Sequence, residues 1–238
     1  MTRLHFSNLL EGEKNEAGSK AMAVSAGVVY QHPFDAKRRL AELNISVEAV
    51  VKAVLAGHTA RLNCTDNDPP FIPGTEAWRF VVRTLRDELL PLGWRKDDPS
   101  NYSLVINDSS QINIVVASSD ALTCSVRGSP RTKSLKGLFT EAAVLKNNLE
   151  SDLFPETVEA ELRKAATILS YPTWMLLIHI EDDDCKAELS LPWSFDDRSV
   201  TEWAERIFIP LPDSDGGLSV DEPADNADID VPVKRKAG

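Results

Sequence analysis

The chain has 238 residues, of which 42% are hydrophobic and 26% are charged, and its formal net charge is −11. These fractions are typical of a globular protein with a sizeable core, so disorder of the whole chain is excluded. The negative charge disfavours a general nucleic-acid-binding protein, because phosphate contacts require clustered Lys and Arg.

The longest apolar run, Trp174–Ile178, is far shorter than the ~20 residues that a membrane span requires. The charged residues Glu11, Lys14 and Glu16 interrupt the first twenty residues before a signal-peptide core can form. Cys64, Cys124 and Cys185 have neither the number nor the spacing of a disulfide framework or a zinc site. We therefore expect reduced thiols, a cytoplasmic location and no contact with a membrane.

Composition divides the chain into three parts. Residues 1–33 are rich in Gly, Ala, Ser and Glu without sustained periodicity, which predicts a flexible N-terminal arm. Residues 34–210 carry the periodic patterns and are expected to form a single α+β domain. Residues 211–238 bury too little apolar surface to offset the entropy of ordering, so they predict a disordered acidic tail. This tail ends in VPVKRKAG, a short basic run that resembles an import signal.

The first half of the domain has helical periodicity. Residues 34–44 predict a short helix, and Ser46 is a suitable N-cap for a second helix that runs to Leu62. Cys64–Gly74 is rich in Pro, Asp and Asn and predicts a loop. Thr75 then begins a helix whose apolar residues recur at spacings of three and four: Trp78, Val81, Val82, Leu85 and Leu89.

The second half contains the strand patterns. SLVIN and INIVV predict a hairpin around Asp108–Ser110, and ALTCSV, residues 121–126, predicts a third strand. Two helices are expected next, near residues 140–150 and 155–169. TWMLLIHI and KAELSLPW predict a second hairpin, and the spacing of Val200, Trp203 and Ile207 predicts a last helix from Arg198 to Ile209.

This order predicts the α+β class. We expect a mixed or antiparallel sheet of about five strands, consisting of a three-stranded meander and a hairpin, packed with about five helices. The order of elements resembles the restriction-endonuclease-like nucleases, which hold a divalent cation with carboxylates and use a lysine on the following strand to orient water. Here the following strand, Leu122–Val126, contains no acid and no lysine, so only the element order resembles that family.

Four acids are the candidates for a dispersed catalytic site on such a scaffold: Asp108, Asp120, Glu181 and Glu188. The run Glu181–Asp184 has no calcium-loop spacing and is typical of a solvated hairpin tip. His179 and Cys185 flank the same turn and form a second candidate pair, for nucleophilic chemistry. The chain lacks the GxxxxGK[ST], GxGxxG, GxSxG and HExxH patterns, so we expect no metal and no cofactor.

Local positive charge without acids marks a candidate binding segment. It contains Arg127, Arg131, Lys133 and Lys136 within a loop and suits phosphates or an acidic protein surface, although a solvated loop explains it too. Trp193 follows Pro192 and is the tryptophan most suited to contact a partner from an exposed position.

The sequence therefore favours a non-enzymatic protein-interaction module or an accessory or regulatory subunit with a protein partner. One form of this function is an acidic inhibitor that occupies a nucleic-acid-binding protein. The alternative is an enzyme with a dispersed acidic site on a degenerate nuclease scaffold.

Overall fold

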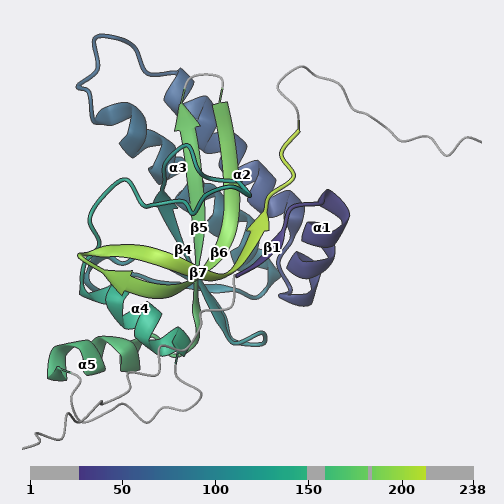
Figure 1. The fold of residues 1–238 in the computed structure, drawn as a ribbon. Helices are drawn as coiled ribbons and strands as arrows, with labels where there is room; N and C mark the ends of the chain where they lie inside the picture. The colour runs from purple at the N-terminus through teal and green to yellow at the C-terminus, as the bar shows by residue number, and fades with distance from the viewer. Residues whose placement is uncertain (1–26, 149–158, 182–183, 213–238) are drawn as a thin grey trace, which may run out of the picture.

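The computed structural model describes residues 27–148, 159–181 and 184–212. These residues form one mixed sheet of seven strands, in the order β1-β7-β6-β5-β4-β3-β2, with helices on both faces (Figure 1). The predicted α+β class is confirmed, but the described sheet has seven strands and not about five. Most of the expected N-terminal arm and of the expected acidic tail lies outside the described residues.

Three helices cover one face of the sheet: α1 (Pro33–Glu42), α2 (Val47–Leu62) and α3 (Ile72–Leu89). The Ser46 side chain accepts a hydrogen bond from the Ala49 N–H at 3.2 Å, which confirms the predicted cap of α2. α3 begins three residues before Thr75, because Pro73 fits within the first turn of a helix.

The helices α2 and α3 pack closely against each other and against the sheet. A Cβ atom added to Gly57 of α2 would lie 2.4 Å from Val81 Cγ2 and 2.7 Å from Ala77 O, so the absence of a side chain permits this approach. The predicted apolar face of α3 is buried at Val81, Leu85 and Leu89.

The three strands that follow α3 in the chain are β2 (Arg95–Asp97), β3 (Leu104–Asn107) and β4 (Ile112–Ser118). β3 pairs antiparallel with both β2 and β4. The predicted hairpin around Asp108–Ser110 is confirmed as β3–β4. The predicted third strand at residues 121–126 is wrong: this segment is a series of turns, and Cys124 has a φ of +60°. The meander is completed instead by β2, a short polar strand without apolar alternation.

The helices α4 (Leu138–Asn148) and α5 (Ala160–Ile168) cover the opposite face of the sheet, as Figure 1 shows. They lie near the ranges that the sequence predicted. Their apolar side chains pack with the odd-numbered residues of the central strands, such as Met175 and Leu177, in a second core cluster. The sheet is therefore buried on both faces.

The last three strands are β5 (Thr173–Glu181), β6 (Asp184–Asp196) and β7 (Ser199–Phe208). β5 is parallel to β4 and antiparallel to β6, so TWMLLIHI is the central strand, as predicted. The predicted helix over Arg198–Ile209 is wrong, because this segment forms β7 and pairs with β6 along its length.

The spacing of the apolar residues in β7 resembled that of a helix because these residues lie on both faces of the sheet. Val200 and Trp203 belong to the core beside α4 and α5, whereas Ile207 belongs to the core beside α1–α3. The pairing with β6 shifts register near Pro192, which changes the phase of the alternation. β1 (Val28–Tyr30) pairs parallel with β7, so regular structure begins inside the expected N-terminal arm.

Residues 119–137 form the long connection between β4 and α4. It crosses the sheet on the α4 side, where Figure 1 shows it in teal in front of the strands. Ser119 and Thr132 form an isolated bridge, and the Asp120 N–H donates to Arg131 O at 3.1 Å. The connection is therefore a closed loop that lies against the sheet.

Candidate functional site

A groove lies beside the last residues of β4. Val115–Ser118 form its floor, Phe71, Gly74, Thr75 and Trp78 at the start of α3 form one wall, and residues 133–137 with Thr140 form the other. Its volume is about 650 Å³, which is within the ~300–1,000 Å³ range of ligand pockets. We call this feature the β4 groove.

Backbone and side-chain hydrogen bonds hold both walls of the β4 groove. Trp78 Nε1 donates to Val116 O at 3.1 Å, which joins α3 to β4. On the other side, the Lys133 N–H donates to Ser118 O at 2.9 Å, and the Lys136 N–H donates to Arg198 O at 2.8 Å. The groove is therefore formed by segments that are far apart in the sequence.

The β4 groove is cationic. Its charged lining residues are Lys133 and Lys136, and the described lining includes no acid. Lys133 Nζ forms an ion pair with Glu181. The Lys136 ammonium lies 3.4 Å from Ser134 Oγ and has no carboxylate within 4 Å among the described residues. Burial lowers the pKa of Lys136, and a carboxylate placed beside it would favour its charged form.

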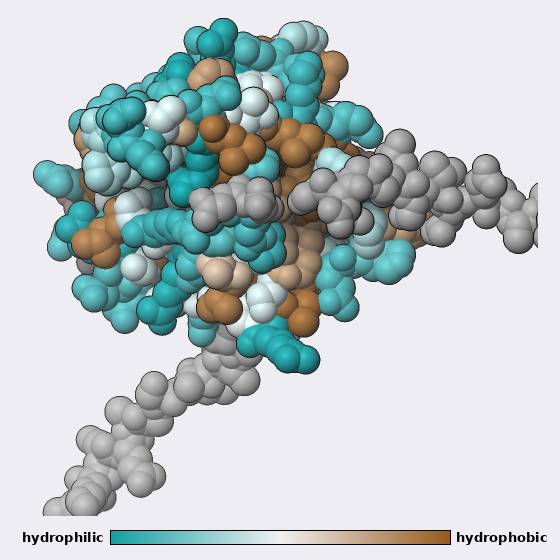
Figure 2. All heavy atoms as spheres, turned by 90° about the horizontal axis from the view of Figure 1, so that it is seen from above, coloured by the Kyte–Doolittle hydropathy of each residue, from teal (hydrophilic) through white to brown (hydrophobic). Residues whose placement is uncertain are grey.

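The two rims of the β4 groove carry exposed apolar side chains. Phe71 at the start of α3 is 68% exposed, and Leu135 in the opposite wall is 62% exposed. Figure 2 shows several hydrophobic patches among hydrophilic side chains on the face seen from above, so exposure alone identifies no site. Phe71 and Leu135 differ from the other exposed apolar residues because they line a groove that also contains the unpaired ammonium group of Lys136.

Tyr102, whose hydroxyl is buried, also lines the groove. The Tyr102 ring stacks on Phe139 with its centroid 5.6 Å away. Its hydroxyl lies beside Thr140 and makes no hydrogen bond of acceptable geometry with a described residue. Burial raises the pKa of Tyr102, so the phenol is neutral at physiological pH.

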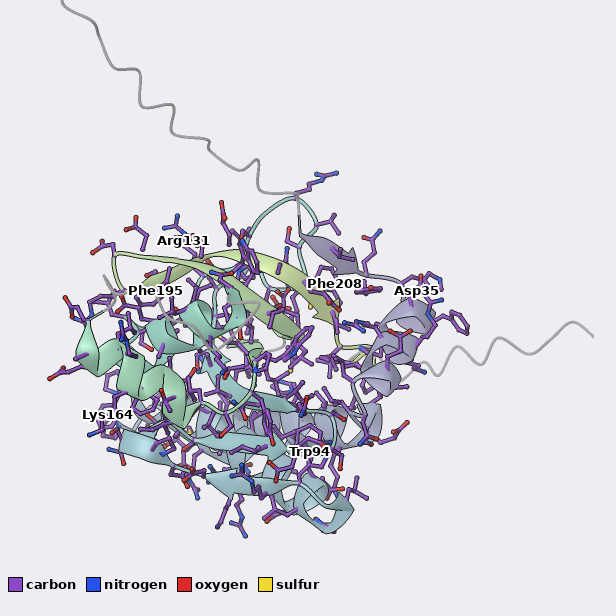
Figure 3. The ribbon with its side chains drawn as sticks, turned by 90° about the horizontal axis from the view of Figure 1, so that it is seen from below. Asp35, Trp94, Arg131, Lys164, Phe195 and Phe208 are labelled. Atoms are coloured by element: carbon purple, nitrogen blue, oxygen red, sulfur yellow. The ribbon has the colours of Figure 1, made fainter. Side chains whose placement is uncertain are left out.

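The four predicted basic residues separate in the structure. Lys133 and Lys136 line the β4 groove, whereas Arg127 lines another surface pocket together with Arg206. Arg131 is exposed at the periphery of the molecule, on the side of Phe195 (Figure 3). The segment is therefore not one continuous basic patch. Trp193, as predicted, is partly exposed, at 37%, but lines none of these pockets.

The four candidate catalytic acids have different neighbours. Asp108 pairs with Arg95, which lowers the pKa of the Asp108 carboxyl, and the Lys133 ammonium lowers the pKa of Glu181. Asp120 Oδ1 accepts from the Leu122 N–H within a turn. The described ranges contain no group of three or more His, Cys, Asp or Glu side chains suited to hold a metal ion.

Glu188 is fully buried and has a structural environment. Its carboxylate accepts hydrogen bonds from Arg206 Nε at 2.8 Å and Nη2 at 2.7 Å, and from the Cys124 N–H at 2.7 Å. Arg206 Nη1 in turn donates to the carbonyl oxygens of Ser125 and Gly128. This ion pair attaches the long connection to β6 and β7 and thereby positions the wall of the β4 groove.

The candidate His179–Cys185 pair does not form. Cys185 lies opposite Ile180 and packs into the core beside α1–α3, whereas His179 lies on the other face and its Nε2 is 3.5 Å from Asp184 Oδ2. Burial raises the pKa of the Cys185 thiol to about 11 and that of Cys124 to about 12. Both thiols are therefore protonated and weakly nucleophilic at neutral pH.

A second groove of about 630 Å³ lies between α2 and α3. Its charged groups already have partners: Glu76 pairs with Arg79 at 2.6 Å, and Asp68 accepts from the Thr65 N–H at 2.8 Å. It therefore offers less unsatisfied hydrogen-bonding capacity than the β4 groove, which we take as the candidate site.

Comparisons with protein-family models, with curated proteins and with solved structures found no match. None of the helices in the described ranges is long and apolar enough to cross a membrane. The function must therefore be argued from the β4 groove. Sequence reasoning identified Lys133 and Lys136 from their charge, but Phe71, Trp78 and Val116 carried no signal of their role beyond their apolar character.

Proposed function

We propose that this protein is a non-enzymatic interaction module or accessory subunit that binds an acidic segment of a partner protein in the β4 groove. The observation that carries this proposal is the charge of the groove. Lys133 and Lys136 line it without an acid, in a chain whose net charge is −11. A partner carboxylate beside Lys136 gains a charge-assisted hydrogen bond in a partly desolvated site.

The described part of the chain is close to neutral. It contains 22 Asp and Glu and 20 Lys and Arg, a net charge of −2, so most of the −11 belongs to residues outside the described ranges. About half of these carboxylates form ion pairs among the described residues, for example Asp98 with Arg86 and Glu88 with Lys52. An inhibitor that imitates phosphates needs a clear excess of carboxylates, so the near-neutral charge of the described part favours a binding groove over an acidic inhibitory face.

The enzymatic alternative has less support from the geometry. Asp108, Glu181 and Glu188 each pair with a different base. Their carboxylates are therefore not held together as a cation site. The three cysteines are free, which agrees with the cytoplasmic location that we propose.

The test is direct binding of a designed peptide to the full-length chain. The probe is a fluorescein-labelled decapeptide of alternating Val and Glu. Its binding is measured by fluorescence anisotropy at low salt. We expect Lys136→Glu to weaken binding at least tenfold, because one charge-assisted hydrogen bond contributes about 1.5–3 kcal/mol and reversal adds repulsion.

A matched control makes the same change of charge away from the groove. Lys164, labelled in Figure 3, is exposed on α5, a helix that contributes no residue to the lining of the groove, so Lys164→Glu should bind the probe within about twofold of the wild type. Equal weakening by both variants would show only a general charge effect. No binding to the wild-type protein would refute the proposed function.

A further inference from the structure

The residues that follow the last described one carry charge opposite to that of the β4 groove. Residues 213–238 contain seven Asp and Glu and three Lys and Arg, a net charge of −4. The groove is lined by Lys133 and Lys136 and by no acid among its described residues. The chain therefore contains, in its own sequence, a segment of the acidic kind that the groove is proposed to bind.

One short part of this segment alternates acidic and apolar residues. Residues 228–233 read DIDVPV, which we call the DIDVPV segment. Its proline has a fixed φ and restricts the preceding valine to extended conformations. Successive side chains of an extended chain point to opposite sides, so Asp228 and Asp230 share one side, whereas Ile229, Val231 and the last valine share the other.

The two walls of the β4 groove match these two sides. In the α3 wall, Phe71 and Trp78 present aromatic surface, and Phe71 is 68% exposed. In the opposite wall, the Lys136 ammonium has no carboxylate partner among the described residues. The Ser118 carbonyl oxygen already accepts from the Lys133 N–H, so side chains of the walls, and not the backbone of β4, hold the segment.

The described chain ends close enough to the groove for the DIDVPV segment to reach it. A row of paired residues crosses the sheet from the end of β7 to the groove: Ile209, Ala187, Ile178 and Ser118. Three strand spacings of ~4.8 Å separate the two ends of this row by about 14 Å. Residues 213–227 precede the segment, and a flexible chain of that length has a root-mean-square span of about 20–24 Å. The span is comparable to the distance, so the effective concentration at the groove is in the millimolar range.

We propose that the DIDVPV segment occupies the β4 groove of its own chain and competes there with the acidic segment of the partner. This inference rests on the proposed function, because it adds regulation to the same groove. At an effective concentration of about 1 mM, a segment with an intrinsic Kd of about 0.1–0.5 mM weakens the binding of a competitor by a factor of about three to ten. Weakly acidic segments are thereby excluded, and a partner must bind more tightly than the chain's own segment.

The experiment removes the two negative charges of the DIDVPV segment in the full-length chain. The double variant Asp228→Asn, Asp230→Asn keeps the size of both side chains and abolishes their charge-assisted pairing with Lys136. We expect the Val–Glu decapeptide to bind about three- to tenfold more tightly to this variant than to the wild type, by fluorescence anisotropy at low salt. Unchanged affinity, with binding that still depends on Lys136, would overturn the inference while the proposed function stands.

A matched control removes two charges from the same part of the chain. Asp213→Asn, Asp215→Asn changes the net charge equally but lies outside the DIDVPV segment, so the decapeptide should bind within about twofold of the wild type. Equal tightening by both double variants would show a general charge effect and would overturn occupancy by this segment. Absence of probe binding to the wild type and to both variants would overturn the inference and the proposed function together.

Cross-linking locates the segment directly. A carbodiimide joins a carboxylate to an amine in contact with it, and mass spectrometry identifies the joined peptides. In a mixture of unlabelled and heavy-isotope-labelled protein, we expect Lys136 to be linked to Asp228 or Asp230 within one chain, and saturating decapeptide to suppress this link. A link mainly between light and heavy chains would show that a second copy fills the groove, and absence of the link would show that the segment lies elsewhere. Either result would overturn the inference.

Discussion

Replacing Glu188 by alanine is expected to lower the free energy of unfolding by about 3–5 kcal/mol. The substitution leaves the Arg206 guanidinium buried without its counter-ion, because this side chain is only 7% exposed. It also removes the acceptor of the Cys124 N–H and of Ser190 Oγ. Arg206 retains hydrogen bonds to two carbonyl oxygens, so its charge stays inside the fold with incomplete compensation.

Unfolding in urea is monitored by tryptophan fluorescence. With a slope of about 2–3 kcal/mol per molar, the expected loss lowers the midpoint by roughly 1–2 M urea. Glu202→Ala removes a half-exposed carboxylate that has no ion pair with a described residue, and it should change stability by less than about 0.5 kcal/mol. A loss below about 1 kcal/mol for Glu188→Ala would refute the reasoning.

A double variant separates the effect of the unpaired Arg206 charge from the loss of side-chain volume, and proteolysis tests whether the ion pair attaches the connection. The double variant Glu188→Met, Arg206→Met removes both charges, so it should recover most of the stability. Trypsin should cleave Glu188→Ala faster than the wild type at Arg127 and Arg131, because both are exposed in the connection that the ion pair attaches. Unchanged cleavage would show that other contacts hold the connection.

Two more predictions concern the stability of the fold. Burial raises the pKa of the Cys124 thiol from an ordinary value near 9 to about 12, so the unfolded chain loses this proton first and the free energy of unfolding falls as pH rises between these values. Under reducing conditions, Cys124→Ala should flatten this fall by up to about 1.4 kcal/mol per pH unit between pH 9 and 11, and equal slopes would contradict it. Arg39 joins α1 to β7 through two hydrogen bonds to Glu205, at 2.5 and 3.0 Å, so Arg39→Ala should cost about 1 kcal/mol in urea unfolding. Arg38→Ala, in an exposed pair with Asp35, is the control and should cost less than half of that; equal costs would contradict a specific α1–β7 contact.

Local patterns predicted the elements whose determinants are local. Ser46 caps α2 because its side chain reaches the Ala49 N–H within the same turn, and the β3–β4 hairpin follows from apolar runs separated by a short polar turn. TWMLLIHI was predicted as the central strand because a fully apolar run suits a strand buried on both faces.

The failures occurred where distant partners decide the conformation. Leu122–Val126 has strand-like composition, but Cys124 adopts a φ of +60° and its N–H binds Glu188, which is 64 residues away. In β7, apolar spacing of three and four resembled a helix because the strand contributes to both cores and changes register opposite Pro192. Tertiary pairing overrode local propensity in both cases.

The sequence by itself determined the α+β class, the buried central strand and the presence of two lysines without an acid nearby in the sequence at residues 133–136, because composition, periodicity and local charge can be read from neighbouring residues. Only the tertiary structure decided that Lys136 and Trp78 line one groove together with the end of β4. That juxtaposition depends on where β3 ends and on how the Glu188–Arg206 ion pair positions the connection. Such long-range contacts leave no periodic signal along the chain, because they join residues that are far apart in the sequence.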